Sequence, residues 1–248
     1  MGDRLRVIGG GEGPPVLLLL HGLGATADVW AGWRPLLAER WPGRWVAPDL
    51  PGHGGSDPLS RYSFGGLAAA VADLAEDGAV VIGHSLGGVI GLALASGWFG
   101  VPVRGVVGLG IKVAWTGAEL DRAGALAARP VQDFPTRAEA AERHLRVSGL
   151  AGLIGADDPA VSGGLRERDG RWRLALDPAA FGVGAPDMPG LLAACRAEVV
   201  LARGAADPMV SADQLAALRP DAVTLPGLGH NAHVEDPAAV LALLDRLR

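Results

Sequence analysis

Short apolar runs alternate with longer helical patterns along most of the chain. The strand-like runs cover residues 5–8, 16–20, 45–47, 79–82, 105–109, 197–201 and 222–225. Those at 16–20 and 79–82 are apolar throughout, as strands are when helices cover both faces of a mostly parallel sheet. The helical patterns between them cover residues 29–40, 64–76, 86–97, 212–218 and 237–247. This alternation predicts a doubly wound, mostly parallel α/β sheet.

The alternation stops between residues 109 and 197. This stretch has helical patterns rich in Ala, Arg and Glu, and prolines such as Pro130 and Pro159 interrupt it. We therefore expect residues 1–111 and 191–248 to form one α/β core. Residues 112–190 are expected to form a small, mostly helical lid inserted into that core.

Charge and composition exclude several kinds of partner. The formal net charge is -5 and there is no run of Lys or Arg, so we expect no binding to nucleic acid or to an acidic membrane. Lys112 is the only lysine and follows Ile111, so the Gly-Lys pair of a phosphate-binding P-loop is absent.

The single cysteine, Cys195, excludes an intrachain disulfide and a cysteine cluster for zinc or iron-sulfur. No apolar run approaches the roughly 18 residues of a membrane span. Charged residues at the start of the chain have no apolar stretch behind them, so we expect an unprocessed, cytoplasmic protein.

Segment 80–95, VVIGHSLGGVIGLALA, places a serine where a strand turns into a helix. Its residues 83–87 match G-x-S-x-G in the strand-to-helix context that this motif needs. Gly83 and Gly87 remove side chains that would collide across so tight a turn. Ser85 is then expected to project alone at the N-terminus of the helix, where negative charge is favoured. The alternative is a turn serine that caps the helix.

Four motifs in order make the chain resemble the serine hydrolases of the α/β-hydrolase fold, of the esterase, lactonase and carbon-carbon hydrolase type. They are HGLG at 21–24, GHSLGG at 83–88, GAADPMV at 204–210 and GLGHNAHVEDP at 227–237. The resemblance covers nearly everything outside the lid. It implies a serine hydrolase that needs no cofactor and no metal.

The resemblance also implies a catalytic triad in the order Ser, acid, His. Ser85 would be the nucleophile, His230 its base and Asp207 the carboxylate that orients the base. Asp207 follows the strand at 197–201 and His230 the strand at 222–225. Both are therefore expected at carboxyl ends of parallel strands, beside Ser85.

Backbone N–H groups are expected to form the oxyanion hole. One belongs to Leu86, just after the nucleophile, and the other to Leu23, in the loop after the second strand.

Rival residues exist for the acid and the base. Glu119 and Asp121 are alternative carboxylates, because some relatives place the acid after the preceding strand, although solvated positions on a lid helix suit them. His233 competes with His230, and HNAHVE permits a metal hypothesis. The Gly-His pair of the family motif falls on Gly229 and His230, which favours His230 and leaves His233 as a flanking surface or pocket residue.

Other polar residues have structural alternatives. Asp207 could cap the helix at 212–218. His21, His53 and His84 lie in family-like loops where histidine is more often hydrogen-bonded than catalytic, and His144 is expected on an exposed lid helix. The loop DLPGHGGSD at 49–57 is assigned a role in loop shape and not in chemistry.

Large apolar residues suggest an apolar substrate pocket. Trp115 and Trp172 fall in the lid, where each could face the opening above Ser85 or belong to the core of the lid. Met209 and Val210 end the third motif. These four are the predicted pocket residues, together with the two leucines of the oxyanion hole.

The expected activity is hydrolysis of a carboxylic ester, lactone or thioester of a small, largely apolar substrate through an acyl-enzyme. Serine at the elbow disfavours the chemistry of relatives with an aspartate nucleophile. A carbon-carbon bond hydrolase, or an acyl-transferring or cyclising enzyme of secondary metabolism, would use the same triad. A non-catalytic small-molecule receptor is the alternative of another class. The expected partner is a small-molecule substrate, and the expected state a monomer or homodimer.

Overall fold

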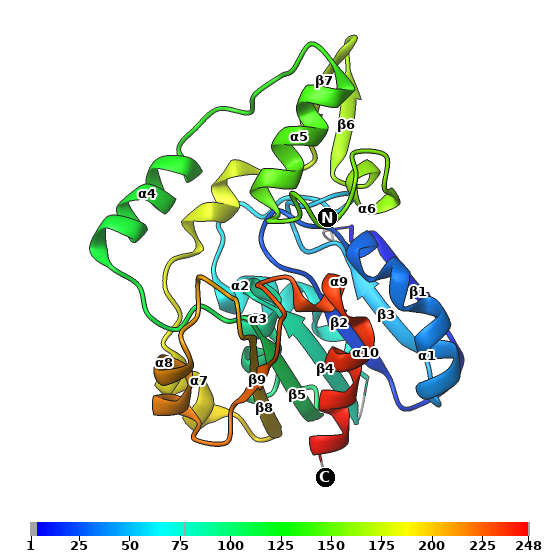
Figure 1. Cartoon of the computed structure of the whole chain (residues 1–248), viewed down its shortest axis with the longest axis vertical. Helices are drawn as coiled ribbons and strands as arrows, with labels where there is room; N and C mark the ends of the chain where they lie inside the picture. Colours follow the sequence, from blue (N-terminus) through cyan, green and yellow to red (C-terminus); the bar gives the residue numbers. More distant parts are fainter. Residues whose placement is uncertain (1–3, 77, 248) are drawn as a thin grey trace.

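The computed structural model describes residues 4–76 and 78–247 (Figure 1). Its main strands are β1 (Val7–Gly10), β2 (Leu17–Leu20), β3 (Trp45–Pro48), β4 (Ala79–His84), β5 (Val103–Leu109), β8 (Glu198–Gly204) and β9 (Val223–Leu225). Within the described residues they form a seven-stranded sheet in the order β1-β3-β2-β4-β5-β8-β9. Only β1 runs antiparallel to its neighbour. The predicted doubly wound, mostly parallel sheet is confirmed.

The sheet is buried on both faces, which explains its apolar strands. Along β2, Leu17 and Leu19 face one cluster of buried side chains, and Leu18 and Leu20 face the other, because side chains alternate along a strand. The first cluster includes side chains from η1 (Ala27–Trp33), α1 (Arg34–Arg40), α9 (Ala232–Glu235), α10 (Pro237–Leu241) and η4 (Ala242–Arg246). The second includes side chains from α2 (Phe64–Val71), η2 (Ala72–Leu74), α3 (Leu86–Leu94), α7 (Met188–Ala194) and α8 (Ala212–Leu218).

The helices of the core follow the predicted positions, with shorter regular pieces. The pattern at 212–218 matches α8, whereas those at 29–40, 64–76 and 237–247 are each divided into an α-helical and a 3-10 piece. In the first of these, α1 starts at Arg34 with Pro35 in its first turn, where the missing N–H costs nothing. Among the described residues, no helix has the length and apolar character needed to cross a membrane.

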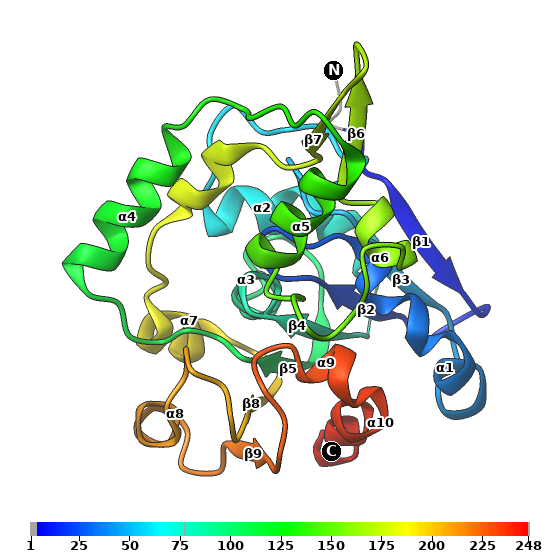
Figure 2. The same ribbon diagram turned by 45° about the horizontal axis from the view of Figure 1, so that its top comes forward.

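The segment between β5 and α7, here called the lid, lies together beyond one edge of the sheet (Figures 1 and 2). Its elements are α4 (Gly117–Ala127), α5 (Arg137–Val147), α6 (Pro159–Ser162), β6 (Leu165–Arg168), β7 (Arg171–Leu174) and η3 (Pro178–Val183). Helix α7 follows, and its Met188 is buried against the core, so the end of the expected segment 112–190 lies on a core helix.

The lid contains a β-hairpin that the helical reading of this segment did not include. Strands β6 and β7 pair antiparallel around the two residues Asp169 and Gly170. Both have positive φ, 52° and 71°, as the commonest two-residue hairpin turn requires. The Asp-Gly pair between short alternating segments is the signal that predicts such a hairpin.

Backbone hydrogen bonds join the lid to the loop at 49–57. The Gly54 N–H donates to the Ala175 carbonyl and the Asp177 N–H to the Gly52 carbonyl, each at 2.7 Å. The Tyr62 hydroxyl donates to the Asp177 carboxylate at 2.8 Å. These hydrogen bonds attach the lid to the DLPGHGGSD loop and to Tyr62.

Most histidines are core residues. His21, His53, His144 and His233 are buried, and burial lowers their pKa values to about 4, 3, 4 and 3. His144 corrects the prediction of an exposed position, because its side of α5 faces the lid interior. A Cβ on Gly164 would lie 2.0 Å from the His144 ring.

These buried histidines predict that the protein loses stability in mild acid. In the unfolded chain a histidine takes up a proton near pH 6.5, but in the folded chain it stays neutral down to the lowered pKa. The free energy of unfolding should therefore fall as the pH drops from about 6.5 to about 4. Each such histidine contributes about 1.4 kcal/mol per pH unit inside this window. Urea unfolding at pH 7, 6 and 5 measures the slope.

The variant His144→Leu isolates one residue of this group. Leucine has a similar volume and no proton to bind, so the slope between pH 6 and 5 should fall by about 1.4 kcal/mol per pH unit. An unchanged slope would mean that His144 is protonated in the folded protein. The comparison is of slopes, so a change in stability at pH 7 does not affect it.

Candidate active site

Ser85 lies on a strained turn between β4 and α3. Its φ is 50° and its ψ -113°, a conformation that is costly for any residue with a side chain. A Cβ on Gly83 would lie 2.3 Å from the Gly87 carbonyl oxygen, and one on Gly87 would lie 2.3 Å from that of Leu20. The Ser85 N–H donates to the Leu109 carbonyl at 2.8 Å. The glycines thus permit the turn, and β5 holds it.

His230 is hydrogen-bonded to Asp207, and the two residues follow the carboxyl ends of the neighbouring strands β9 and β8. Their Nδ1 and Oδ2 atoms are 2.9 Å apart, and the Asp207 side chain is completely buried. With the Nδ1 proton donated to the carboxylate, the Nε2 of a neutral His230 is a proton acceptor. The second oxygen of Asp207 accepts from the Met209 N–H at 2.8 Å. Gly110 packs against the ring, since a Cβ there would lie 3.3 Å from it.

A cavity of about 500 Å³ joins the serine and the histidine. Both Ser85 and His230 line it, and so do the predicted Trp115 and Met209. Its wall is mostly apolar and includes Leu23, Phe64, Leu86, Val89, Leu126, Val147, Phe181 and Val183. Phe64 and Phe181 were not predicted, because only the fold brings α2 and η3 to the same opening. The cavity suits an apolar group attached to a reactive carbonyl.

The two leucines expected at the oxyanion hole lie at this cavity. Leu86 is the first residue of α3, so its N–H is among those that have no partner within the helix. Leu23 lies in the loop after β2 and also lines the cavity. Both leucines thus line the cavity that Ser85 lines, and their role as an oxyanion hole stays a prediction.

Two predicted pocket residues lie elsewhere. Trp172 is in β7, where its backbone pairs with Phe134 and its side chain packs on the lid's own small core. Val210 is buried in the core beneath the sheet's helices, and its carbonyl accepts from Arg203 at 2.6 Å. Neither lines the cavity.

The rival carboxylates have other partners or positions. Glu119 lines the cavity but accepts from Lys112 Nζ at 2.8 Å and caps α4 through Thr116. The Lys112 hydrogen bond is the main reason that the pKa of Glu119 is lowered to about 2. Asp121 is exposed. The helix that Asp207 might have capped is capped by Ser211, which accepts from the Gln214 N–H.

His233 is a core residue and does not line the cavity. Its ring lies between those of Trp30 and His84, with centroids 4.6 and 4.3 Å away. Trp33 donates to its carbonyl at 2.8 Å. The expected surface or pocket position is therefore corrected.

His84 supports the backbone of His230. Its Nε2 donates to the His230 carbonyl at 2.9 Å, and burial, together with neighbouring histidines, lowers its pKa well below the usual value. The other ring nitrogen is buried without a hydrogen-bond partner among the described residues. A neutral His84 therefore holds the loop that carries His230. In residues 4–76 and 78–247, no group of three or more His, Cys, Asp or Glu side chains could hold a metal ion.

Comparisons with known sequences place these features in a family. The sequence model of the "Alpha/beta hydrolase family" matches residues 17–243. The chain is 45% identical over 92 residues to the magnesium-chelatase 30 kDa subunit of Rhodobacter capsulatus, covering 33% of this chain and 30% of that protein. It is 39% identical over 85 residues to a pimeloyl-[acyl-carrier protein] methyl ester esterase of Methylococcus capsulatus, covering 34% and 32%. It therefore spans about a third of the length of these curated relatives.

Solved structures are similar over nearly the whole chain. The crystal structure of E-2-(acetamidomethylene)succinate hydrolase has a TM-score of 0.80 and 27% identity, covering 99% of this chain and 95% of that one. A thioesterase domain from the curacin biosynthetic pathway has a TM-score of 0.79 and 21% identity, covering 98% and 95%. The second likeness is one of fold alone.

Proposed function

Because the chain belongs to the alpha/beta hydrolase family, we propose that it is a serine hydrolase that cleaves a carboxylic ester, thioester or lactone through an acyl-enzyme. One observation carries the proposal. Ser85, on its strained turn, lines the same cavity as His230, and the Nδ1 of His230 is hydrogen-bonded to the buried Asp207 carboxylate. A nucleophile, a base and an orienting carboxylate are the three groups that acyl transfer needs.

In the first half of the reaction, Ser85 Oγ attacks the substrate carbonyl carbon while His230 Nε2 takes the hydroxyl proton. The carbonyl π electrons move onto oxygen, and Asp207 stabilises the imidazolium that forms. The carbonyl then re-forms, the bond to the leaving group breaks, and His230 returns the proton to the departing alcohol or thiol. The acyl group remains on Ser85.

In the second half, water replaces the leaving group. His230 takes a proton from the water as its oxygen attacks the acyl carbon, and then returns that proton to Ser85 Oγ as the acid departs. In each tetrahedral intermediate the N–H groups of Leu23 and Leu86 bind the oxyanion. One such donor typically stabilises the transition state by about 3 kcal/mol.

The apolar cavity wall and one relative support an ester as the substrate. The wall matches a small apolar acyl group. A relative of this chain is named as a methyl ester esterase, and a similar solved structure as a hydrolase.

Labelling with a fluorophosphonate probe tests the proposal. Ser85 Oγ should displace fluoride from phosphorus, so intact protein gains one phosphonyl group, and peptide mass spectrometry should place it on Ser85. Protein denatured before the reaction is the control and should remain unlabelled, because an isolated serine hydroxyl is a poor nucleophile. Intact protein that is not labelled at Ser85 would contradict the serine-hydrolase proposal.

A substrate panel then separates the reaction classes. Aryl esters, lactones, thioesters and β-diketones at neutral pH are compared by kcat/KM. We expect turnover of an ester, thioester or lactone with an apolar acyl group. Turnover of the β-diketone alone would assign carbon-carbon bond cleavage instead, and turnover of none would favour a receptor or a specialised acyl transferase.

A further inference from the structure

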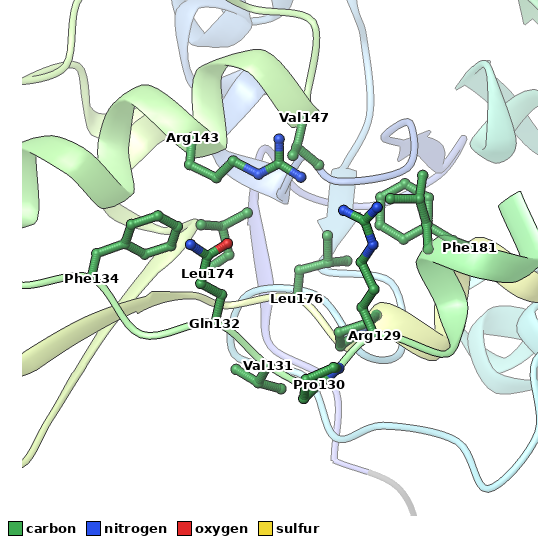
Figure 3. Close-up of a pocket in the computed structure, with 12 residues that line it drawn as sticks. Arg129, Pro130, Val131, Gln132, Phe134, Arg143, Val147, Leu174, Leu176 and Phe181 are labelled. Atoms are coloured by element: carbon green, nitrogen blue, oxygen red, sulfur yellow. The ribbon is translucent and has the colours of Figure 1, made fainter. Parts of the chain in front are cut away.

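A second pocket opens in the lid beside the catalytic cavity (Figure 3). Leu126, Val147 and Phe181 line both, so these three side chains form the partition between them. The pocket has a volume of about 90 Å³, against about 500 Å³ for the catalytic cavity. It has room for a small group at the end of a substrate and not for a whole substrate.

Two arginines line this second pocket. Arg143 comes from α5, and Arg129 lies just after α4. Figure 3 shows the side chains of Arg129 and Arg143 with their guanidinium ends turned toward one another. Helix α5 and the loop after α4 thus bring two permanently charged guanidinium groups to one small pocket.

Neither charge is paired with a described residue. Neither guanidinium forms a hydrogen bond or ion pair with a residue in the described part of the chain, and no described carboxylate lines the pocket. The other side chains that line the pocket are apolar, apart from that of Gln132. Two unpaired guanidinium groups facing one pocket repel each other, and an anion between them would remove that repulsion.

Two cations of the catalytic cavity differ in this respect. Lys112 is paired with Glu119 at 2.8 Å, and Arg146 is paired with Glu142 at 3.1 Å. Their charges are already neutralised where they stand. The uncompensated pair formed by Arg129 and Arg143 therefore has the stronger attraction for an external anion.

We propose that Arg129 and Arg143 form an anion subsite that binds a carboxylate or phosphate at the far end of the substrate. The reactive carbonyl of that substrate lies at Ser85, and an apolar chain runs past Leu126 and Phe181 into the lid pocket. Guanidinium groups bind such oxyanions through two parallel N–H bonds. This inference rests on the proposed hydrolase function, and it adds the substrate class: esters or thioesters that end in an anion.

Matched pairs of substrates test the subsite. In the first arm, p-nitrophenyl monoesters of adipic and suberic acid are compared with p-nitrophenyl esters that have the same chain but end in methyl. In the second arm, hexanoyl-pantetheine is compared with its 4′-phosphate. The first arm places the anion on the acyl group and the second on the leaving group. We expect the wild-type kcat/KM to be about tenfold higher for the anionic member of at least one pair, as for a charged hydrogen bond.

Arginine-to-methionine variants then locate the binding group. Methionine keeps an apolar stem but carries no charge. Arg129→Met and Arg143→Met should each lower the anionic preference several-fold, and the double variant should abolish it. Each should hydrolyse the neutral ester within about twofold of wild type. Arg104→Met, at an exposed position on β5, is the control for the loss of one charge and should keep the preference.

Arg122 is the competing location, because it lines the catalytic cavity itself. If Arg122→Met alone abolishes the preference, or if the double variant keeps it, the assignment to Arg129 and Arg143 is wrong. A wild-type protein with no preference in either arm would also overturn it. These outcomes differ from failure of the hydrolase proposal, in which Ser85 is not labelled and the neutral esters are not cleaved either.

Discussion

Replacing Ser85 with alanine is expected to lower kcat for ester hydrolysis by about 10⁶-fold, to the residual rate that substrate binding and the oxyanion hole can sustain. The acyl-enzyme cannot form without the Oγ nucleophile, and His230 then has no serine hydroxyl from which to take a proton. The measurement is steady-state hydrolysis of the best ester in the panel, with the residual rate confirmed on a second preparation. Retention of more than about 1% of kcat would contradict the role of Ser85 as nucleophile.

A second variant at the same position separates catalysis from folding. Glycine adopts a φ of 50° without strain, so Ser85→Gly should raise the free energy of unfolding by about 1 kcal/mol while activity is lost as in Ser85→Ala. A serine that only shaped the turn would not couple higher stability to lost activity. Ser60→Ala, at an exposed loop position, is the control and should leave both quantities unchanged.

The parts of the candidate site that follow from sequence are those fixed by local geometry. The turn at Ser85 needs glycine at positions 83 and 87, because the carbonyls of Gly87 and Leu20 leave no space for a Cβ. The two glycines of the motif therefore predict the turn from sequence. The positions of Asp207 and His230 follow from their place after two strands, since parallel strands end at one edge of the sheet. The hydrogen bond between them is consistent with that expectation.

Residues whose environment depends on packing between distant segments were misplaced. His233 lies on a four-residue helix, which is too short for a periodic pattern to show which side is buried. Its burial follows from ring contacts with Trp30 and His84, which come from other parts of the chain. His144 lies on a helix of polar composition, yet that helix packs on the lid interior. For Trp172 the cavity and the core of the lid were both open, and its side chain packs on the core of the lid.

The proposed anion subsite also depends on packing between separate segments, and the sequence did not predict it. Arg129 lies in the loop after α4 and Arg143 lies on α5, and the surrounding sequence contains many other arginines. Only the folded lid shows that these two share a pocket that no described carboxylate lines. A net charge of -5 therefore gave no indication of a local positive site.

Replacing Asp207 with asparagine is expected to lower kcat by about 10⁴-fold with little change in the fold. The carboxylate accepts two hydrogen bonds, one from the Met209 N–H and one from His230 Nδ1. An asparagine has one side-chain oxygen, and the backbone N–H of Met209 can only donate, so that oxygen turns toward Met209. The amide NH₂ then faces His230 Nδ1 and leaves the proton on Nε2. In this tautomer His230 cannot accept the proton of Ser85.

The same substitution at Asp236 provides the matched control for this tautomer argument. Asp236 caps α10 by accepting from the Ala239 N–H at 2.9 Å, and asparagine caps helices equally well. Asp236→Asn removes one negative charge from the motif that carries His230 but leaves the partners of His230 unchanged, so it should keep both kcat and melting temperature. Glu119→Gln should also retain most activity, because the partners of Glu119 are Lys112 and Thr116 and not His230. If Glu119→Gln lost as much activity as Asp207→Asn is expected to lose, while Asp207→Asn stayed active, the acid of the triad would be Glu119.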